Sequence, residues 1–248
     1  MHDTDAEHII KQQIYIISHF MKNDSIGKSK ILDLGCGNGD VVNAYRKRGL
    51  ECYGCDFEFK PGSNVQILEE RGWIKKLPID NYQIPFEDGF FDLVVTNQVM
   101  EHVQDYDRTL SEVRRVLKNG GVVLHIFPSR FRPIEPHINV PFAGIIQYYW
   151  WLKLWALLGI RSPKDDKGLK ASEIADKNHR YLLNCTNYLG KKDLIKYFSK
   201  YFSGVHFCEK EYMATTRKGP FVHRISKYVP AIENIYSSLR TRVIVCIK

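Results

Sequence analysis

The chain has 248 residues, of which 44% are hydrophobic and 26% charged, a composition that suits one globular domain with a sizeable core and excludes a disordered or fibrous chain. Its formal net charge of +8 fits an anionic partner or simply a solvated basic surface, because the lysines and arginines form no run of like charge. Six cysteines are too few for a disulfide scaffold of this length, and the polar first residues differ from a signal peptide, so we expect a cytoplasmic protein with reduced thiols.

Predicted helices and strands alternate along the chain. A leading helix is expected within residues 1–29, where apolar residues recur at helical spacing between Ala6 and Met21. Further helices are predicted at residues 39–49, 99–121 and 190–202. Strands are predicted at residues 29–36, 50–58, 90–98, 120–129, 204–213 and 241–248, with a short one near 75–80 after an irregular stretch. This alternation predicts an α/β fold with a doubly wound, mostly parallel, seven-stranded sheet.

The alternation of strands and helices stops between residues 129 and 182, where no sheet strand is predicted. The aromatic run "IIQYYWWLKLWALLGI" lies in this part, but Pro141, Gly144 and Lys153 interrupt the apolar stretch too often for a membrane-spanning helix. We therefore predict a helical cap, residues 129–182, inserted into a single domain of residues 1–248. The aromatic stretch at 140–160 could serve as a lid over an apolar pocket, as a peripheral membrane contact or as an oligomer interface.

The stretch "ILDLGCGNGD" follows the first buried strand and places glycines at positions 35, 37 and 39. Such glycines allow a sharp turn and let the backbone approach a ligand at the carboxyl edge of a sheet. The spacing is not the G-x-G-x-x-G of a dinucleotide site, and no Gly-Lys-Ser/Thr follows as in a phosphate-binding loop. Asp33 within the motif disfavours an anion and tolerates an ammonium or sulfonium group.

The pair Cys52 and Cys55 has the C-x-x-C spacing of zinc and redox sites. It lies in a predicted strand, on which residues three apart point to opposite faces. No second pair completes a zinc site, so we predict no metal here or elsewhere in the chain.

Four segments in order resemble the class I S-adenosylmethionine-dependent methyltransferases. They are "ILDLGCGNGD", "YGCDFE", "PIDNYQIPFEDGFFDLVVTNQVMEHV" and "EVRRVLKNGGVVL". The resemblance covers about Lys30 to Pro128 and returns weakly from Tyr181 to Lys248. It implies a Rossmann-like methyltransferase fold, S-adenosylmethionine as cofactor and S-adenosylhomocysteine as product.

The resemblance also implies which residues bind the cofactor. Asp56 is placed for the ribose hydroxyls, Phe57 for the adenine face, and Asn97 for the methionine part. Asp80 and Asn81 match the family's contacts to the adenine edge. The full predicted set is Asp33, Gly35, Cys36, Gly37, Asp56, Phe57, Asp80, Asn81 and Asn97.

The acceptor is less defined by the sequence. His137 and His102 are the candidates for a base or a substrate contact, since a hydroxyl acceptor must lose a proton. We expect a small-molecule acceptor methylated at oxygen, such as a sugar, a quinone-like or polyketide-like compound, or a lipid-linked glycan. A non-catalytic cofactor-binding protein and a nicotinamide oxidoreductase are the alternatives. No nucleic acid is expected, because "TNQVMEH" stands where a base-flipping enzyme carries an Asn/Asp-Pro-Pro-aromatic motif.

Overall fold

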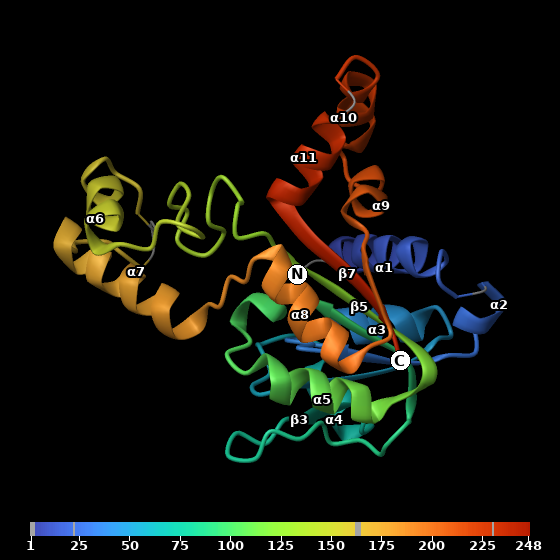
Figure 1. The fold of residues 1–248 in the computed structure, drawn as a ribbon. Helices are drawn as coiled ribbons and strands as arrows, with labels where there is room; N and C mark the ends of the chain where they lie inside the picture. Colours follow the sequence, from blue (N-terminus) through green and yellow to red (C-terminus); the bar gives the residue numbers. More distant parts are fainter. Residues whose placement is uncertain (1–2, 22, 162–164, 230) are drawn as a thin grey trace.

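The computed structural model describes residues 3–21, 23–161, 165–229 and 231–248, and a seven-stranded sheet lies at its centre (Figure 1). The strands are β1 (Lys30–Leu34), β2 (Glu51–Asp56), β3 (Ile74–Lys76), β4 (Phe91–Asn97), β5 (Leu117–Pro128), β6 (Gly204–Phe207) and β7 (Thr241–Ile247). Their spatial order is β3-β2-β1-β4-β5-β7-β6. Only β7 runs antiparallel to its neighbours β5 and β6, which confirms the predicted mostly parallel sheet.

The strand order reverses at β1, whose two neighbours are β2 and β4. From β1 the chain first builds toward β3 at one edge and then returns to add β4 and β5 on the other side. Loops that leave β1 and β4 therefore diverge, and a crevice opens at their carboxyl ends. This is the position in which open α/β sheets bind ligands.

Eleven helices and one 3-10 turn surround the sheet within the described residues. The helices are α1 (Asp3–Ile17), α2 (Asn23–Ile26), α3 (Asp40–Lys47), α4 (Val65–Glu70), α5 (Tyr106–Val116), α6 (Tyr149–Leu157), α7 (Ala171–Cys185), α8 (Lys191–Tyr201), α9 (Glu209–Ala214), α10 (Gly219–Ser226) and α11 (Ile232–Arg240). The 3-10 turn, η1, covers Met100–His102.

Two buried layers cover the two faces of the sheet. Helices α1, α3 and α4 supply Ile10, Tyr45 and Leu68 to one layer, while α5 and α8 supply Leu110 and Phe198 to the other. Strands covered on both faces read as nearly continuous apolar runs, which explains the composition of β4. Cys52 packs into the first layer and Cys55 into the second, so the C-x-x-C pair points to opposite faces as predicted.

Three predicted elements differ in the structure. The single helix expected at residues 99–121 divides into η1, α5 and the first residues of β5, because the Asp105 side chain accepts a hydrogen bond from the Arg108 backbone N–H and starts a new helix there. The strand predicted at 204–213 stops at Phe207 and α9 follows. The stretch predicted as irregular before β3 contains α4.

The cap contains α6 and α7, which pack against each other at one side of the sheet (Figure 1). It has its own small core, in which Val140, Leu152 and Leu182 are fully buried. The Trp151 indole N–H donates to the Pro141 carbonyl at 2.8 Å and holds the loop against α6. Among the described residues, no helix combines the length and the apolar character needed to cross a membrane.

Candidate active site

A cavity of about 810 Å³ opens at the carboxyl edge of the sheet, where the strand order reverses. The turn after β1, the end of β2 and the end of β4 form its walls. Seven of the nine predicted cofactor-binding residues line it: Asp33, Gly35, Cys36, Gly37, Asp56, Phe57 and Asn97. The structure thus brings together residues that are 64 positions apart in the chain, from Asp33 to Asn97 (97 − 33).

The glycine turn and Asp56 are joined by hydrogen bonds. One carboxylate oxygen of Asp56 accepts from the Gly37 backbone N–H at 2.8 Å, and the other accepts from the Phe57 backbone N–H at 2.8 Å. Each oxygen can accept a second hydrogen bond. Asp56 is therefore held in one orientation at the end of β2, with acceptor capacity left for two neighbouring hydroxyl groups.

Gly35 occupies a position that only glycine suits. Its φ of 83° lies in the left-handed region, and a Cβ built there would lie 2.3 Å from Cγ2 of Val99. Val99 belongs to the loop after β4 and lines the same cavity. The close approach of these two loops fixes the width of the crevice between β1 and β4.

Asp33 is a buried acid behind the glycine turn, with 3% of its surface exposed. Burial, together with the nearby charge of Asp56, raises the pKa of Asp33 to about 7. A cationic group bound in the cavity would favour its ionised form. Burial likewise raises the pKa of the Cys36 thiol, so this thiol stays protonated and is no nucleophile at neutral pH.

The adenine side of the predicted site contains aromatic rings. Phe57 is 47% exposed, and its ring centroid lies 5.8 Å from that of Tyr82, which also lines the cavity. Asp80 and Asn81 are exposed and do not line the cavity, and Asn81 accepts a hydrogen bond from Arg108. Their predicted contact with an adenine edge therefore stays a prediction, and Tyr82 is a cavity residue that the motif did not identify.

A polar cluster lies next to the cavity and contacts it through His102. It comprises Glu101, His102 and His137, whose potential ligand atoms all lie within 4.8 Å of one another. His102 lines the cavity, and its ring centroid is 4.9 Å from that of His137 in the cap. The two predicted catalytic candidates, 35 positions apart (137 − 102), are thus neighbours in the fold.

The histidines of this cluster are oriented by a backbone carbonyl and a buried carboxylate. The His102 Nδ1 lies 2.6 Å from the Cys185 carbonyl oxygen, and the His137 Nδ1 lies 2.5 Å from a carboxylate oxygen of Glu135. The Tyr188 hydroxyl donates to the same oxygen of Glu135 at 2.6 Å. Burial lowers the pKa of His102, so its ring is neutral at pH 7.

Two acids next to the histidines have pKa values shifted in opposite directions. Burial alone would raise the pKa of Glu135, but hydrogen bonds from His137, Tyr188 and the Ile138 backbone N–H bring it below its usual value. Burial raises the pKa of Glu101 to about 7. Its carboxylate accepts no hydrogen bond from any residue in the described part of the chain.

Another histidine of the sheet has a structural role. The His125 ring is fully buried in β5, where its Nδ1 lies 2.8 Å from the Thr96 hydroxyl. Burial lowers the pKa of His125 to about 3, so the ring stays neutral. It does not line the cavity and takes no part in the site.

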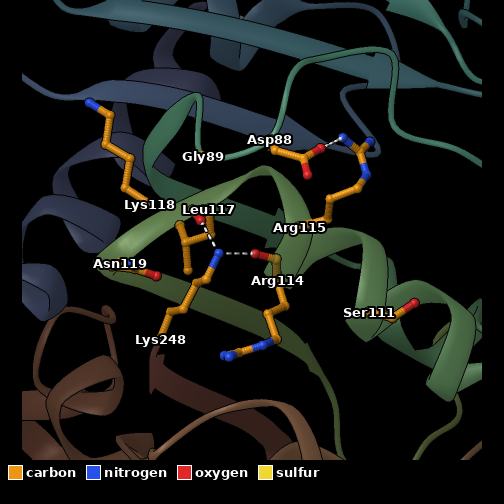
Figure 2. A pocket seen from close by; sticks show the side chains of 9 residues that line it. All are labelled: Asp88, Gly89, Ser111, Arg114, Arg115, Leu117, Lys118, Asn119 and Lys248. Carbon is orange, nitrogen blue, oxygen red and sulfur yellow. Dashed lines mark hydrogen bonds and ion pairs between the residues drawn. The ribbon is translucent and has the colours of Figure 1, made fainter.

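A second hollow lies at the opposite, amino-terminal edge of β4 and β5 (Figure 2). The Lys248 ammonium group donates there to the carbonyl oxygens of Arg114 and Leu117, and Arg115 pairs with Asp88 at 2.7 Å. The basic groups of this hollow are engaged with carboxylates or backbone carbonyls, and none belongs to the predicted site. We assign no ligand to it.

Comparison with known proteins identifies the central part of the chain. A family model described as a methyltransferase domain matches residues 32–125. Demethylmenaquinone methyltransferase of Thermobifida fusca is 30% identical over 116 residues, covering 46% of this chain and 49% of that protein. Ubiquinone biosynthesis O-methyltransferase of Acinetobacter baylyi is 30% identical over 106 residues, covering 40% and 42%. The chain spans about half the length of the curated relatives it matches.

Solved structures agree with the methyltransferase match at the level of fold. An S-adenosylmethionine-dependent methyltransferase from Mesorhizobium loti superimposes with a TM-score of 0.52 and 15% identity, covering 90% of this chain and 92% of that one. The similarity therefore extends over most of the chain at the level of fold. The cap residues and His137 lie outside the matched family range.

Proposed function

Because the chain belongs to the class I S-adenosylmethionine-dependent methyltransferases, we propose that it transfers a methyl group from this cofactor to an oxygen atom of a small-molecule acceptor. The observation that carries the proposal is the Asp56 carboxylate, fixed by Gly37 at the edge where the strand order reverses. An acid at the end of the second strand, beside a glycine turn, is suited to hold vicinal ribose hydroxyls.

The residues of the cavity fit this cofactor. When bound, S-adenosylmethionine supplies an electrophilic methyl group on a sulfonium centre. Asp56 would orient the ribose, Phe57 and Tyr82 would flank the adenine ring, and Asp33 would favour the positively charged end of the molecule. The glycine turn excludes side chains from this contact, so the backbone itself approaches the ligand.

The acceptor is proposed to bind between the cavity and the cap. Methyl transfer is an in-line displacement, for which the protein mainly supplies positioning and exclusion of water. His102 lines the cavity, Glu101 and His137 lie next to His102, and the basic atoms of these residues can accept the proton of a hydroxyl group. A quinone-like or catechol-like compound is consistent with the names of the relatives in quinone biosynthesis.

A lipid-type acceptor at a membrane surface is the second candidate. The cap exposes large apolar side chains around α6, with Tyr148 at 66%, Trp150 at 60% and Leu157 at 65%. Exposed Lys153 and Arg161 lie in the same part of the chain. Apolar side chains beside basic ones favour contact with an anionic lipid surface, from which an apolar acceptor could reach the site.

A methyl-transfer assay tests the proposed function. Purified protein is incubated with methyl-labelled S-adenosylmethionine and separate quinol, catechol, sugar and lipid-linked hydroxyl compounds, and the label is measured in each acceptor. Transfer to a hydroxyl oxygen, abolished in Asp56→Ala, is the expected result. Cofactor binding without label in any of these hydroxyl compounds would contradict the proposed O-methylation and favour a non-catalytic cofactor-binding protein.

A further inference from the structure

The cluster of Glu101, His102 and His137 next to the cavity has the composition of a metal centre. Glu101 and His102 come from η1, directly after β4, while His137 comes from the cap loop that also contains Glu135. Their potential ligand atoms all lie within 4.8 Å of one another, and the His102 Nε2 is 4.0 Å from a Glu101 oxygen. Tetrahedral bonds of about 2 Å place ligands roughly 3.3 Å apart, so a contraction of about 1.5 Å at most would close this set around one ion.

The hydrogen bonds behind the histidines leave each ring with a free nitrogen. A carbonyl oxygen can only accept, so the contact with the Cys185 carbonyl requires the proton of His102 on Nδ1 and leaves Nε2 with its lone pair. The Glu135 carboxylate does the same for His137, since it faces the Nδ1 of that ring and also accepts from the Tyr188 hydroxyl. Metal-binding histidines usually donate their second N–H to a carboxylate or a backbone carbonyl, and both arrangements are present here.

The buried carboxyl group of Glu101 indicates that a positively charged partner is missing from the cluster. The residue is 1% exposed, and neither of its carboxylate oxygens accepts a hydrogen bond from the described residues. A buried carboxyl group without a partner costs stability, and native proteins rarely leave one so. A cation bound between Glu101 and the two histidines would supply that partner.

We propose that Glu101, His102 and His137 bind one divalent first-row transition-metal ion, with Zn²⁺ or Co²⁺ as suitable occupants. Two neutral imidazoles and one carboxylate form a donor set that suits these ions and is too rich in nitrogen for Mg²⁺ or Ca²⁺. The sequence-based expectation of no metal rested on the cysteine pair, and the third ligand lies 35 positions from the second (137 − 102). The site combines the methyltransferase sheet with a cap residue outside the matched family range.

The proposed ion also defines the acceptor, a point that rests on the proposed function. Three protein ligands leave coordination positions open, as in catalytic metal sites, and His102 lines the cavity in which the acceptor is expected. An oxygen bound to the ion has a lowered pKa, so its hydroxyl loses the proton more readily. The favoured class is a hydroxyl with a neighbouring oxygen, as in catechols, vicinal diols and hydroxy acids, because both oxygens can bind the ion.

Titration of chelator-treated, tag-free protein with Co²⁺, followed by visible absorption of the bound ion, tests the proposal. One Co²⁺ should bind per chain and be displaced by Zn²⁺, and Glu101→Gln and His137→Gln should each weaken binding by about tenfold or more. His206→Gln, at an exposed position of β6, is the matched control and should bind as the unaltered protein does. Absence of saturable Co²⁺ binding, or Co²⁺ affinity in both site variants equal to that of the unaltered protein, would overturn the proposal.

Binding of S-adenosylhomocysteine is measured on the same preparations. Loss of Co²⁺ binding with intact nucleoside binding shows that a variant is folded and that the effect is local. If Co²⁺ binds but the nucleoside does not, the metal site stands and the proposed function fails. If the nucleoside binds and Co²⁺ does not, the proposed function stands and the metal proposal fails.

Discussion

Asp33 links the stability of the fold to the binding of the cofactor. Its pKa of about 7 in the folded chain lies above the ordinary value of 3.8, because burial and the charge of Asp56 both disfavour its ionised form. The folded state therefore holds a proton that the unfolded chain releases near pH 4. Between about pH 4 and pH 7 the stability should fall as the pH rises, and above pH 7 this cost is constant.

Replacement of Asp33 by asparagine should separate its effect on fold stability from its effect on cofactor binding. Asp33→Asn removes the buried charge, so at pH 8 the variant should unfold at a higher temperature than the unaltered chain while it binds S-adenosylmethionine more weakly. Thermal unfolding between pH 5 and 8 and calorimetric titration measure the two effects. A variant that is less stable at pH 8, with unchanged affinity, would show that Asp33 serves only the fold.

Gly35 and Gly49 form a matched pair for testing the crevice. Both have positive φ, 83° and 77°, but a Cβ at Gly35 meets Val99 whereas nothing lies within 4 Å at Gly49. Gly49→Ala should cost about 1–2 kcal/mol, the penalty of a left-handed backbone. Gly35→Ala should cost more and also impair cofactor binding, because Val99 must move. Denaturant unfolding of both variants checks this, and equal losses would contradict the close approach of the two loops.

Local sequence identified one side of the site better than the other. Asp33, the glycine turn and Asp56 follow buried strands directly, and the ends of parallel strands meet at one edge, so their proximity could be predicted. The contact of His102 with His137 depends on how the cap folds back, which no local pattern encodes. Glu101 was passed over because its missing hydrogen-bond partners are visible only in three dimensions. The position of Glu101, shortly after a buried strand, was a sequence signal that could have marked it as a candidate site residue.

At the scale of elements, the cap is connected to the sheet through η1. The Asn187 backbone N–H donates to the Glu101 carbonyl at 2.6 Å, and the Asn187 side-chain amide donates to the Val103 carbonyl at 2.9 Å. Together with the His102 contact to Cys185, these bonds hold the end of α7 against the loop after β4. The cluster of Glu101, His102 and His137 therefore depends on this docking for its geometry.

The prediction of a continuous helix at 99–121 failed at this same place. Apolar residues continue at nearly helical spacing through Val99 and Val103, so periodicity alone did not reveal the break. Asp105 is a helix-capping residue that marks the start of α5, and such a residue is a local signal that could have placed the boundary. The central strands, by contrast, were predicted well because their apolar runs bear no other interpretation.

A buried ion pair joins α9 to the antiparallel strand β7. The Arg242 guanidinium donates to Glu209 at 3.0 Å, and both side chains are less than 10% exposed. Glu209→Ala should destabilise the chain by about 3 kcal/mol, because it leaves the Arg242 charge buried without its partner. Glu7→Gln, which removes the exposed pair with Arg48, should have little effect on denaturant unfolding. Similar losses of unfolding free energy in the two variants would contradict a stabilising role for the buried Arg242–Glu209 pair.

At the scale of the whole molecule, a regular α/β domain presents its ligand edge to a cap with an apolar surface (Figure 1). The sequence-based expectation of a cap at residues 129–182 rests on the end of strand periodicity after residue 128; α6 and most of α7 lie within this range. The sequence could not predict that α6 spans only nine residues, because the aromatic run continues on both sides of that helix. Vesicle binding distinguishes whether the apolar surface around α6 contacts a membrane or serves as a lid.

The apolar surface around α6 should bind lipid vesicles if the second candidate function is correct. The protein should sediment with vesicles that contain anionic lipid, and Trp150→Glu should release it, because the substitution places a like charge against the surface. Ile79→Glu is the control, since Ile79 is 80% exposed outside the cap. If the unaltered protein stays in the supernatant, the exposed side chains of α6 serve a lid or a protein partner.

The most direct test of the account is calorimetric titration of S-adenosylhomocysteine into the unaltered protein and Asp56→Ala, with NADH as the competing ligand class. We predict one nucleoside bound per chain, no binding of NADH, and a loss of about tenfold to hundredfold in affinity when the Asp56 carboxylate is removed. Thermal unfolding of the variant without ligand shows that the fold is retained. Binding of NADH, or equal affinity of both proteins for the nucleoside, would contradict the assignment of this cavity to S-adenosylmethionine.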